Sequence, residues 1–369
     1  MELTEHNDLD NITSLSRIED DKYMWLDKFT LKNLELVSPS QEDSITLKSV
    51  IDQTVTPMGS RLMSKWILNP LLNKKDICDR QEYVKAFLLN ETVRESVFNS
   101  ISEISDIERI SSKIALKRAS PRELLFLKKS LISAEDLKLQ LKNSKEKVFN
   151  SWSSEVPDSK KIISKIGSAI HEEASMLSSG KVIKDGYNAE LDKLRKISNT
   201  GKDILLKIQN EEIERTGITS LKVAYNKVFG YYLEVTNAHK DKVPENWIRK
   251  QTLVNAERYI TEELKKYEES ILTADEKINE IEKVLFFEVL NDLSENILAI
   301  QKTSKSIALL DSVLSFANLA YSSNLSEPEI TEEKVIDIKK GRHLIIAVSY
   351  THLRAHETLR YLVCRLLLE

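Results

Sequence analysis

Polar and basic side chains of the kinds that contact sugar-phosphate oxygens gather between residues 226 and 258. Arginine and lysine supply charge, whereas asparagine, glutamine and threonine supply neutral hydrogen bonds. Asn226 and Lys227 lie at an apparent turn, and the others lie just before a helical segment whose first N–H groups could add donors. The candidates for contact with a phosphodiester are Asn226, Lys227, Arg249, Lys250, Gln251, Thr252, Asn255 and Arg258.

The region around these candidates is locally basic in a chain whose net charge is −4. Between residues 219 and 260, seven lysine and arginine residues stand against four aspartate and glutamate residues. A positive excess suits a polyanionic partner, although a charged run is also typical of a solvated face. In that second interpretation Glu257, Glu262 and Glu263 pair with the neighbouring bases. If the basic candidates are exposed, replacing one should change stability by about 0–1 kcal/mol.

No catalytic, cofactor or metal site emerges from the sequence. The G-x-x-x-x-G-K-[ST] motif is absent, so no loop is expected to cradle the phosphates of ATP. His352 and His356 have the i, i+4 spacing of a helical metal pair, but no third ligand accompanies them. Cys78 and Cys364 match no metal or redox spacing, which indicates a reducing compartment. The cytoplasm is therefore the expected location.

The composition predicts a mainly α-helical fold. Hydrophobic residues make up 41% and charged residues 30% of 369 residues, while glycine (8) and proline (7) are scarce. The first residues lack the apolar core of a signal peptide, and no apolar run is long enough to span a bilayer. We therefore expect no membrane partner.

A series of medium helices is predicted before residue 145. Pro57 suits a first helical position, and Ser120-Pro121-Arg122-Glu123 combines a hydroxyl cap, a proline and a first-turn acid. Apolar content falls between 142 and 161, where we expect a loop, with helix resuming near Lys161. The expected helices cover 46–54, 57–72, 74–90, 106–119 and 120–141.

Two long helices are predicted on either side of a β-rich patch, LKVAYNKVFGYYLEVT at 221–236. Residues 186–217 place their apolar side chains largely on one helical face, and 264–285 repeat them at spacings of three and four, as in a coiled coil. Helices of roughly 25 residues would form an arm of about 35–40 Å with the sheet at its tip. A plain connector needs only a few residues, so a tip that contacts a partner is favoured. Its tyrosines are expected mostly to pack the sheet rather than stack on bases.

Longer stretches of the chain resemble the MutS family of DNA mismatch repair proteins over roughly residues 15–343. The resemblance is carried by YMWLDKFTLKNLEL (23–36), TPMGSRLMSKWILNPL (56–71), GYNAELDKLRK (186–196), TGITSLKVAYNKVFGYYLEVT (216–236), VPENWIRKQTLVNAERYITEELKKYEESIL (243–272) and PEITEEKVIDIKKGRH (328–343).

The resemblance implies a fold with a helical core and two antiparallel lever helices that carry a small β-rich clamp on DNA. It assigns 1–202 to the core and first lever helix, 203–261 to the clamp, 262–325 to the returning lever helices and 326–343 to the start of an ATPase domain. The full-length family binds ATP and Mg²⁺, forms a homodimer and recognises mismatches. The family's mismatch-reading and connector domains have no counterpart here, and neither do its Walker motifs, so no cofactor is expected in this chain.

The tail at 344–369 does not follow the family pattern. Its SYTHLRAHET and LVCRLLLE stretches resemble translated sequencing-adapter sequence, and we expect this tail to be artefactual rather than an evolved segment. A short amphipathic helix is the alternative.

Two functions of different classes remain open. The first is a MutS fragment that binds the double-stranded DNA backbone without reading sequence and without hydrolysing ATP by itself. The alternative is a structural coiled-coil protein whose β-rich tip contacts another protein. Steep salt dependence of DNA affinity would favour the first, because phosphate contacts release counterions.

Overall fold

The computed structural model describes residues 22–39, 41, 44–174, 181–226, 230–339 and 341–347. The chain is mainly helical with one small antiparallel sheet, which confirms the predicted fold class at this level. Within these residues no helix is long and apolar enough to cross a membrane. Two compact units are formed, one from residues within 1–119, 126–163 and 293–369 and the other from 120–125 and 164–292.

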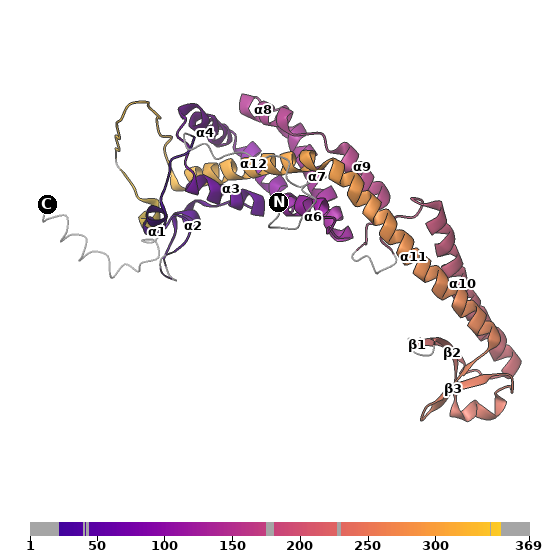
Figure 1. Cartoon of the computed structure of the whole chain (residues 1–369). Helices are drawn as coiled ribbons and strands as arrows, with labels where there is room; N and C mark the ends of the chain where they lie inside the picture. The colour runs from indigo at the N-terminus through magenta and orange to yellow at the C-terminus, as the bar shows by residue number, and fades with distance from the viewer. Residues whose placement is uncertain are drawn as a thin grey trace, which may run out of the picture. The chain divides into compact units, whose positions relative to one another are not determined.

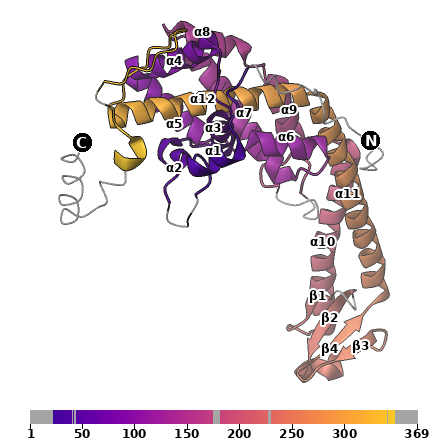
Figure 2. The same cartoon turned by 60° about the vertical axis from the view of Figure 1, so that its left-hand side comes forward.

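The first unit is built around one apolar helix, α12 (Ile297–Ser323), which packs most extensively against five shorter helices. Buried side chains occur on every side of α12, as expected of a helix that other helices surround. Figures 1 and 2 show α12 running among them. Its partners are α2 (Leu47–Ile51), α3 (Pro57–Leu68), α4 (Lys74–Leu89), α5 (Glu91–Ser102) and α6 (Ile107–Ala115).

The remaining helices of the region before residue 170 are α1 (Lys28–Asn33), α7 (Pro121–Lys142), α8 (Lys147–Glu155) and α9 (Lys160–Ala169). The capping prediction at the start of α7 is confirmed, because the Ser120 N–H donates to Glu123 (2.8 Å) and the Glu123 N–H donates to the Ser120 hydroxyl (3.3 Å). The expected loop at 142–161 is wrong in its middle, where α8 buries Phe149 and Trp152. Helix α5 was also not predicted.

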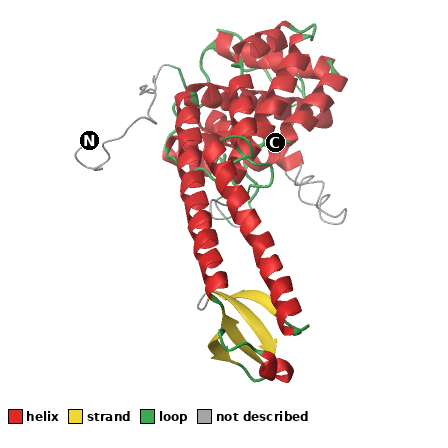
Figure 3. Cartoon of the chain, turned by 90° about the vertical axis from the view of Figure 1, so that its right-hand side faces the viewer, coloured by secondary structure: helices red, strands yellow, loops and turns green. Residues whose placement is uncertain are grey.

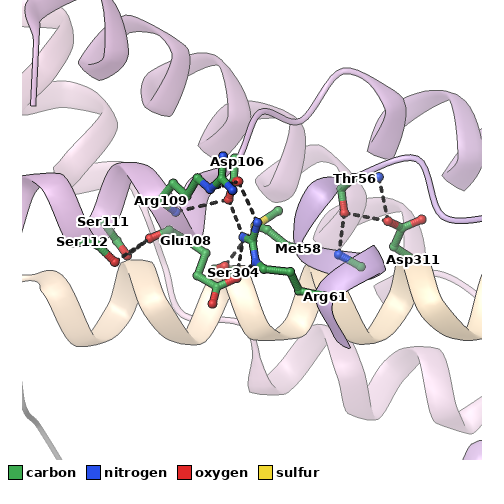
Figure 4. A network of polar contacts seen from close by, with 11 residues as sticks. Thr56, Met58, Arg61, Asp106, Glu108, Arg109, Ser111, Ser112, Ser304 and Asp311 are labelled. Carbon is green, nitrogen blue, oxygen red and sulfur yellow. Dashed lines mark hydrogen bonds and ion pairs between the residues drawn. The ribbon is translucent and has the colours of Figure 1, made fainter. Parts of the chain in front are cut away.

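A buried carboxylate joins the start of α3 to α12 (Figure 4). Thr56 caps α3 by accepting a hydrogen bond from the Gly59 N–H (3.0 Å). The Thr56 hydroxyl and N–H both donate to Asp311 Oδ2, at 2.6 and 2.9 Å, and the Val55 N–H donates to Oδ1. A Cβ atom on Gly59 would lie 2.2 Å from Asp311 Oδ2, so only glycine leaves room for this carboxylate.

A second polar contact fastens α3 to α6. The Arg61 guanidinium donates to Asp106 Oδ1 (2.7 Å) and to Glu108 Oε2 (2.6 Å), as Figure 4 shows. Asp106 is also the N-cap of α6, where it accepts from the Arg109 N–H. One carboxylate thus fixes both the start of α6 and its position beside α3.

The second unit contains two long antiparallel helices, α10 (Ala189–Thr216) and α11 (Glu262–Glu295). Arg195 pairs with Glu282, and Ser198 donates to Asp275 at 2.7 Å, so the contacts move down one helix as they move up the other. Both predicted long helices are confirmed. Helix α10 ends at Thr216 and is followed by the cap residue Gly217, whose φ of 65° is the left-handed conformation that glycine adopts readily.

A four-stranded antiparallel sheet lies between α10 and α11 in the sequence and at their ends in Figure 3. Its spatial order is β1-β2-β4-β3, so β1 and β3 are the edge strands. The hairpin expected within 221–236 is present as β1 and β2, but the last two strands were not predicted. The elements are β1 (Lys222–Asn226), β2 (Gly230–Thr236), a 3₁₀ helix η1 (Asn237–Lys242), β3 (Ile248–Thr252) and β4 (Ala256–Ile260).

Candidate nucleic-acid interface

The sheet has its own apolar core, which includes the adjoining ends of α10 and α11. Leu233 on β2 and Tyr259 on β4 are paired neighbours and belong to this cluster, together with Leu205 of α10 and Leu264 of α11. The indole of Trp247 packs against Tyr259 with ring centroids 5.8 Å apart. These contacts stabilise the sheet from within. Its exposed edge, formed by β3 and the loop that follows it and called the rim below, is left available for another molecule.

Some tyrosines of the sheet are buried, and one is half exposed. Tyr232 and Tyr259 are buried, as expected for side chains that pack a sheet. Tyr225 is half exposed and lies against Tyr231, with ring centroids 4.9 Å apart.

The predicted site residues lie on both strands and loops of this sheet. Arg249, Lys250, Gln251 and Thr252 belong to the edge strand β3, rather than to the approach to a helix. Asn255 lies in the loop between β3 and β4, Arg258 lies on β4, and Asn226 ends β1. Lys227 is outside the described residues.

Exposed side chains lie along β3 and in the hairpin loop between β3 and β4. Lys250, Thr252 and Asn255 are exposed, and Val254 between them is 91% exposed. Asn237 holds this loop from the start of η1, because its side chain donates to the Val254 carbonyl (2.8 Å) and its N–H donates to the Asn255 carbonyl (3.2 Å). The end of β3 and the loop that follows it thus present a charge, a hydroxyl and an amide.

Arg258 differs from the other basic candidates, because its guanidinium is already bonded within the sheet. It donates to Glu234 Oε2 on β2 (3.1 Å) and to Gln251 Oε1 on β3 (2.8 Å). Its carbon Cζ lies 4.3 Å from the ring centroid of Tyr232, a cation–π contact. Only 17% of the side chain is exposed. The condition of exposure, under which replacing a basic candidate should change stability little, therefore does not hold for Arg258.

A second group of charges surrounds Glu257 on β4. Its side chain is 3% exposed, yet it forms ion pairs with Lys240 (2.8 Å) and Arg249 (3.5 Å) and accepts a hydrogen bond from the Tyr259 hydroxyl. The Lys240 ammonium, and next the Tyr259 hydroxyl, hold the pKa of Glu257 below its ordinary value. Burial, and next the Glu257 carboxylate, raises the pKa of Tyr259 to about 12.

A β-bulge separates these two groups. Arg249 is paired with Tyr259, whereas Gln251 is paired with Arg258, so Lys250 is the extra residue. Arg249 and Gln251 are two residues apart and would share a face of a regular strand. The bulge instead places Arg249 with Glu257 on one face and Gln251 with Arg258 on the other.

Two of these residues were not among the predicted site residues. In the sequence Lys240 contributes only to the local positive charge, and Glu257 is expected only as a partner for neighbouring bases in a solvated charged run. Glu257 does pair with bases, but across strands. Glu257 and Tyr259 are two residues apart, and this spacing places two side chains on one face if the segment is a strand.

The backbone N–H donors expected at the start of the second long helix are partly used by hydrogen bonds within the chain. Helix α11 begins at Glu262, and the hydroxyl of Thr261 accepts from the Leu264 N–H (3.1 Å). One of the free donors of this helix end is therefore capped by the protein itself.

The fold and this site define a mainly helical protein in which a small antiparallel sheet, basic at its rim, is inserted between two long helices. Residues 29–317 match MutS domain III. The chain therefore belongs to the MutS family.

Curated relatives agree with this assignment. The chain is 48% identical over 347 residues to the DNA mismatch repair protein MutS of Bacteroides fragilis, 47% over 345 residues to that of Bacteroides thetaiotaomicron and 45% over 344 residues to that of Cytophaga hutchinsonii. These matches cover 93–94% of this chain and 40% of each relative. The chain thus spans less than half the length of the curated relatives it matches.

Proposed function

We propose that this chain is the part of a cytoplasmic DNA mismatch repair protein that holds double-stranded DNA by its backbone. In this proposal the first unit supplies the helical core, α10 and α11 act as the two lever helices, and the sheet with η1 acts as the clamp. ATP and Mg²⁺ binding, mismatch recognition and homodimer formation belong to the longer protein of the family. Double-stranded DNA is the partner of the clamp.

The observation that carries the proposal is the composition of the sheet's rim. The exposed residues of β3 and of the loop that follows it combine charge with neutral hydrogen-bonding groups: Arg249, Lys250, Thr252 and Asn255. Such groups neutralise or bond phosphate oxygens and carry no sequence information by themselves. A duplex with any sequence, matched or mismatched, is therefore expected to bind this surface.

Fluorescence anisotropy of a labelled duplex across a salt series tests the proposal. Lys250→Ala should weaken binding equally for matched and mismatched duplexes and lower the slope of log affinity against log salt by about one. Asn255→Ala should weaken binding and leave the slope unchanged, because a neutral amide releases no counterion. The matched control is Lys277→Ala, an exposed lysine on α11.

Arg258 should behave differently from Lys250 in the same series. Its charge is balanced by Glu234 and its guanidinium is mostly covered, so Arg258→Ala should change the salt slope by less than Lys250→Ala does. If Lys250→Ala and Asn255→Ala both stay at the affinity and slope of Lys277→Ala, the sheet is not a DNA-binding clamp.

A protein-contacting tip is the second candidate function. Exposed apolar side chains on the same rim, Ile248 and Val254, favour it. In the anisotropy series this candidate predicts affinity for duplex no greater than that of the control and no dependence on Lys250.

A further inference from the structure

Lys240 and Arg249 converge on one buried carboxylate from different parts of the second unit. Lys240 lies in η1, Arg249 lies on the edge strand β3, and Glu257 lies on β4. The Lys240 ammonium and an Arg249 guanidinium nitrogen lie 2.8 and 3.5 Å from the same atom, Glu257 Oε1. The two cations are thus neighbours because they share an acceptor.

The two cations are accessible to a ligand, whereas the carboxylate that they share is buried. Glu257 is 3% exposed, whereas Lys240 is 53% and Arg249 is 56% exposed. The carboxylate lies underneath, and the two cations lie above it with much of their surface toward solvent. An ammonium has three N–H donors and a guanidinium has five, so most of their donors are not used by Glu257.

The group carries a net charge of about +1 with the carboxylate ionised. The Tyr259 hydroxyl donates to the same carboxylate, and the pKa of Glu257 is below its ordinary value, so the carboxylate is ionised at neutral pH. A buried acceptor also restricts two long, flexible side chains, which lowers the entropic cost of ordering them around a ligand.

We propose that Lys240 and Arg249, held together by Glu257, form a second phosphate-binding site of the clamp, on the face of β3 opposite to the Arg258 group. The inference rests on the proposed binding of double-stranded DNA and adds to it Lys240 as a binding residue and Glu257 as a positioning residue. Its ligand is a phosphodiester oxygen, for which a guanidinium and an ammonium are complementary donors.

Replacing Glu257 distinguishes a positioning role from a purely electrostatic one, because the two roles predict opposite changes in affinity for duplex DNA. Glu257→Gln removes a negative charge close to the DNA, so electrostatics alone predicts tighter binding. If the carboxylate holds the two cations in place, the same variant should bind duplex about threefold more weakly. The loss should disappear in a Lys240→Ala/Arg249→Ala background, because nothing is then left to position.

The single cation variants test the site directly in the anisotropy series. Lys240→Ala and Arg249→Ala should each weaken binding roughly three- to tenfold and lower the salt slope by about 0.9. The matched control is Lys242→Ala, an exposed lysine of the same 3₁₀ helix that forms no ion pair with another described residue. It should keep the affinity and slope of the unaltered chain to within a factor of two.

Three outcomes would overturn the inference. The first is that Lys240→Ala matches Lys242→Ala in affinity and slope, and the second is that Glu257→Gln binds more tightly. The third is an effect of Glu257→Gln that persists without the two cations. If Glu257→Gln does not fold, Lys240→Gln and Arg249→Gln decide, because both positions are exposed. Loss of binding in Lys250→Ala, with no change in Lys240→Ala, would leave the proposed function standing and remove only this second site.

Discussion

At the scale of single residues, the basic side chains of the sheet differ in the contacts that they make with the rest of the protein. Lys250 projects from a bulge, Arg249 rests on a buried carboxylate, and Arg258 is enclosed by two hydrogen-bond partners and a tyrosine ring. Sequence alone ranks these residues equally, because the sequence displays their charge and not their partners.

Arg258 should therefore matter more for stability than Lys250. Arg258→Ala leaves Glu234 and Gln251 without their partner and uncovers Tyr232, which should lower the free energy of unfolding by about 1–3 kcal/mol. Lys250→Ala, at an exposed position, should lower it by roughly 0.5 kcal/mol or less. Urea unfolding of the two variants checks this. Equal midpoints would show that the Arg258 contacts do not stabilise the sheet.

Glu257 should make stability depend on pH on the acid side. Its pKa in the folded chain is below the ordinary value of 4.5, so its contribution is complete above that value and is lost as the pH falls from there through the folded-state pKa. The difference in urea midpoint between the unaltered chain and Glu257→Gln should shrink between neutral pH and pH values well below 4.5. Glu245→Gln, at an exposed position, is the control. A difference that is constant across this range would contradict the prediction.

At the scale of elements, the start of α3 depends on the one glycine that faces Asp311. Gly59→Ala would place a methyl group against the carboxylate oxygen, so Asp311 must move away from Thr56 or α3 must shift. We expect a loss of roughly 1–3 kcal/mol in the free energy of unfolding, although alanine is the better helix former. Ser64→Ala on the same helix is the control. Thermal and urea unfolding measure both, and an unchanged Gly59→Ala would show that the network is easily rearranged.

Elements with a regular apolar pattern or a clear cap could be predicted from the sequence, and elements with neither could not. Apolar residues at spacings of three and four predict helices α10 and α11, and the N-terminal cap predicts the start of α7. Strand β3 is exposed along most of its length, so it shows no alternation, and β4 is buried on both faces, so it shows none either. Helix α8 was missed because only a few large side chains, Phe149 and Trp152, anchor an otherwise polar segment.

The candidate site shows the same division. The types of residue that suit a phosphodiester were visible in the sequence, and the structure places most of them on or beside β3. The convergence of Lys240, Arg249 and Glu257 was not visible, because it depends on the pairing of β3 with β4 and on the position of η1. Pairing register and bulges are set by tertiary packing rather than by local residue types.

At the scale of the whole molecule, the chain is expected to bind duplex without nucleotide turnover. No G-x-x-x-x-G-K-[ST] loop is present to hold the phosphates of ATP. Purified chain incubated with ATP and Mg²⁺ should release no phosphate above the background of a denatured sample. Release that saturates with ATP and is proportional to protein concentration would contradict the prediction.

The bond between Asp311 and Thr56 joins residues that are 255 positions apart, and the residues of the second unit lie between them in the sequence. A ribosome synthesises α3 to α6 first, then the complete second unit, and only afterwards α12, against which the earlier helices pack. During synthesis, therefore, the sheet and its two long helices can fold while the first unit still exposes the apolar faces that α12 will cover. The first unit therefore stays partly folded, with apolar faces exposed, while more than a hundred further residues are translated. Chaperones bind partly folded chains of this kind.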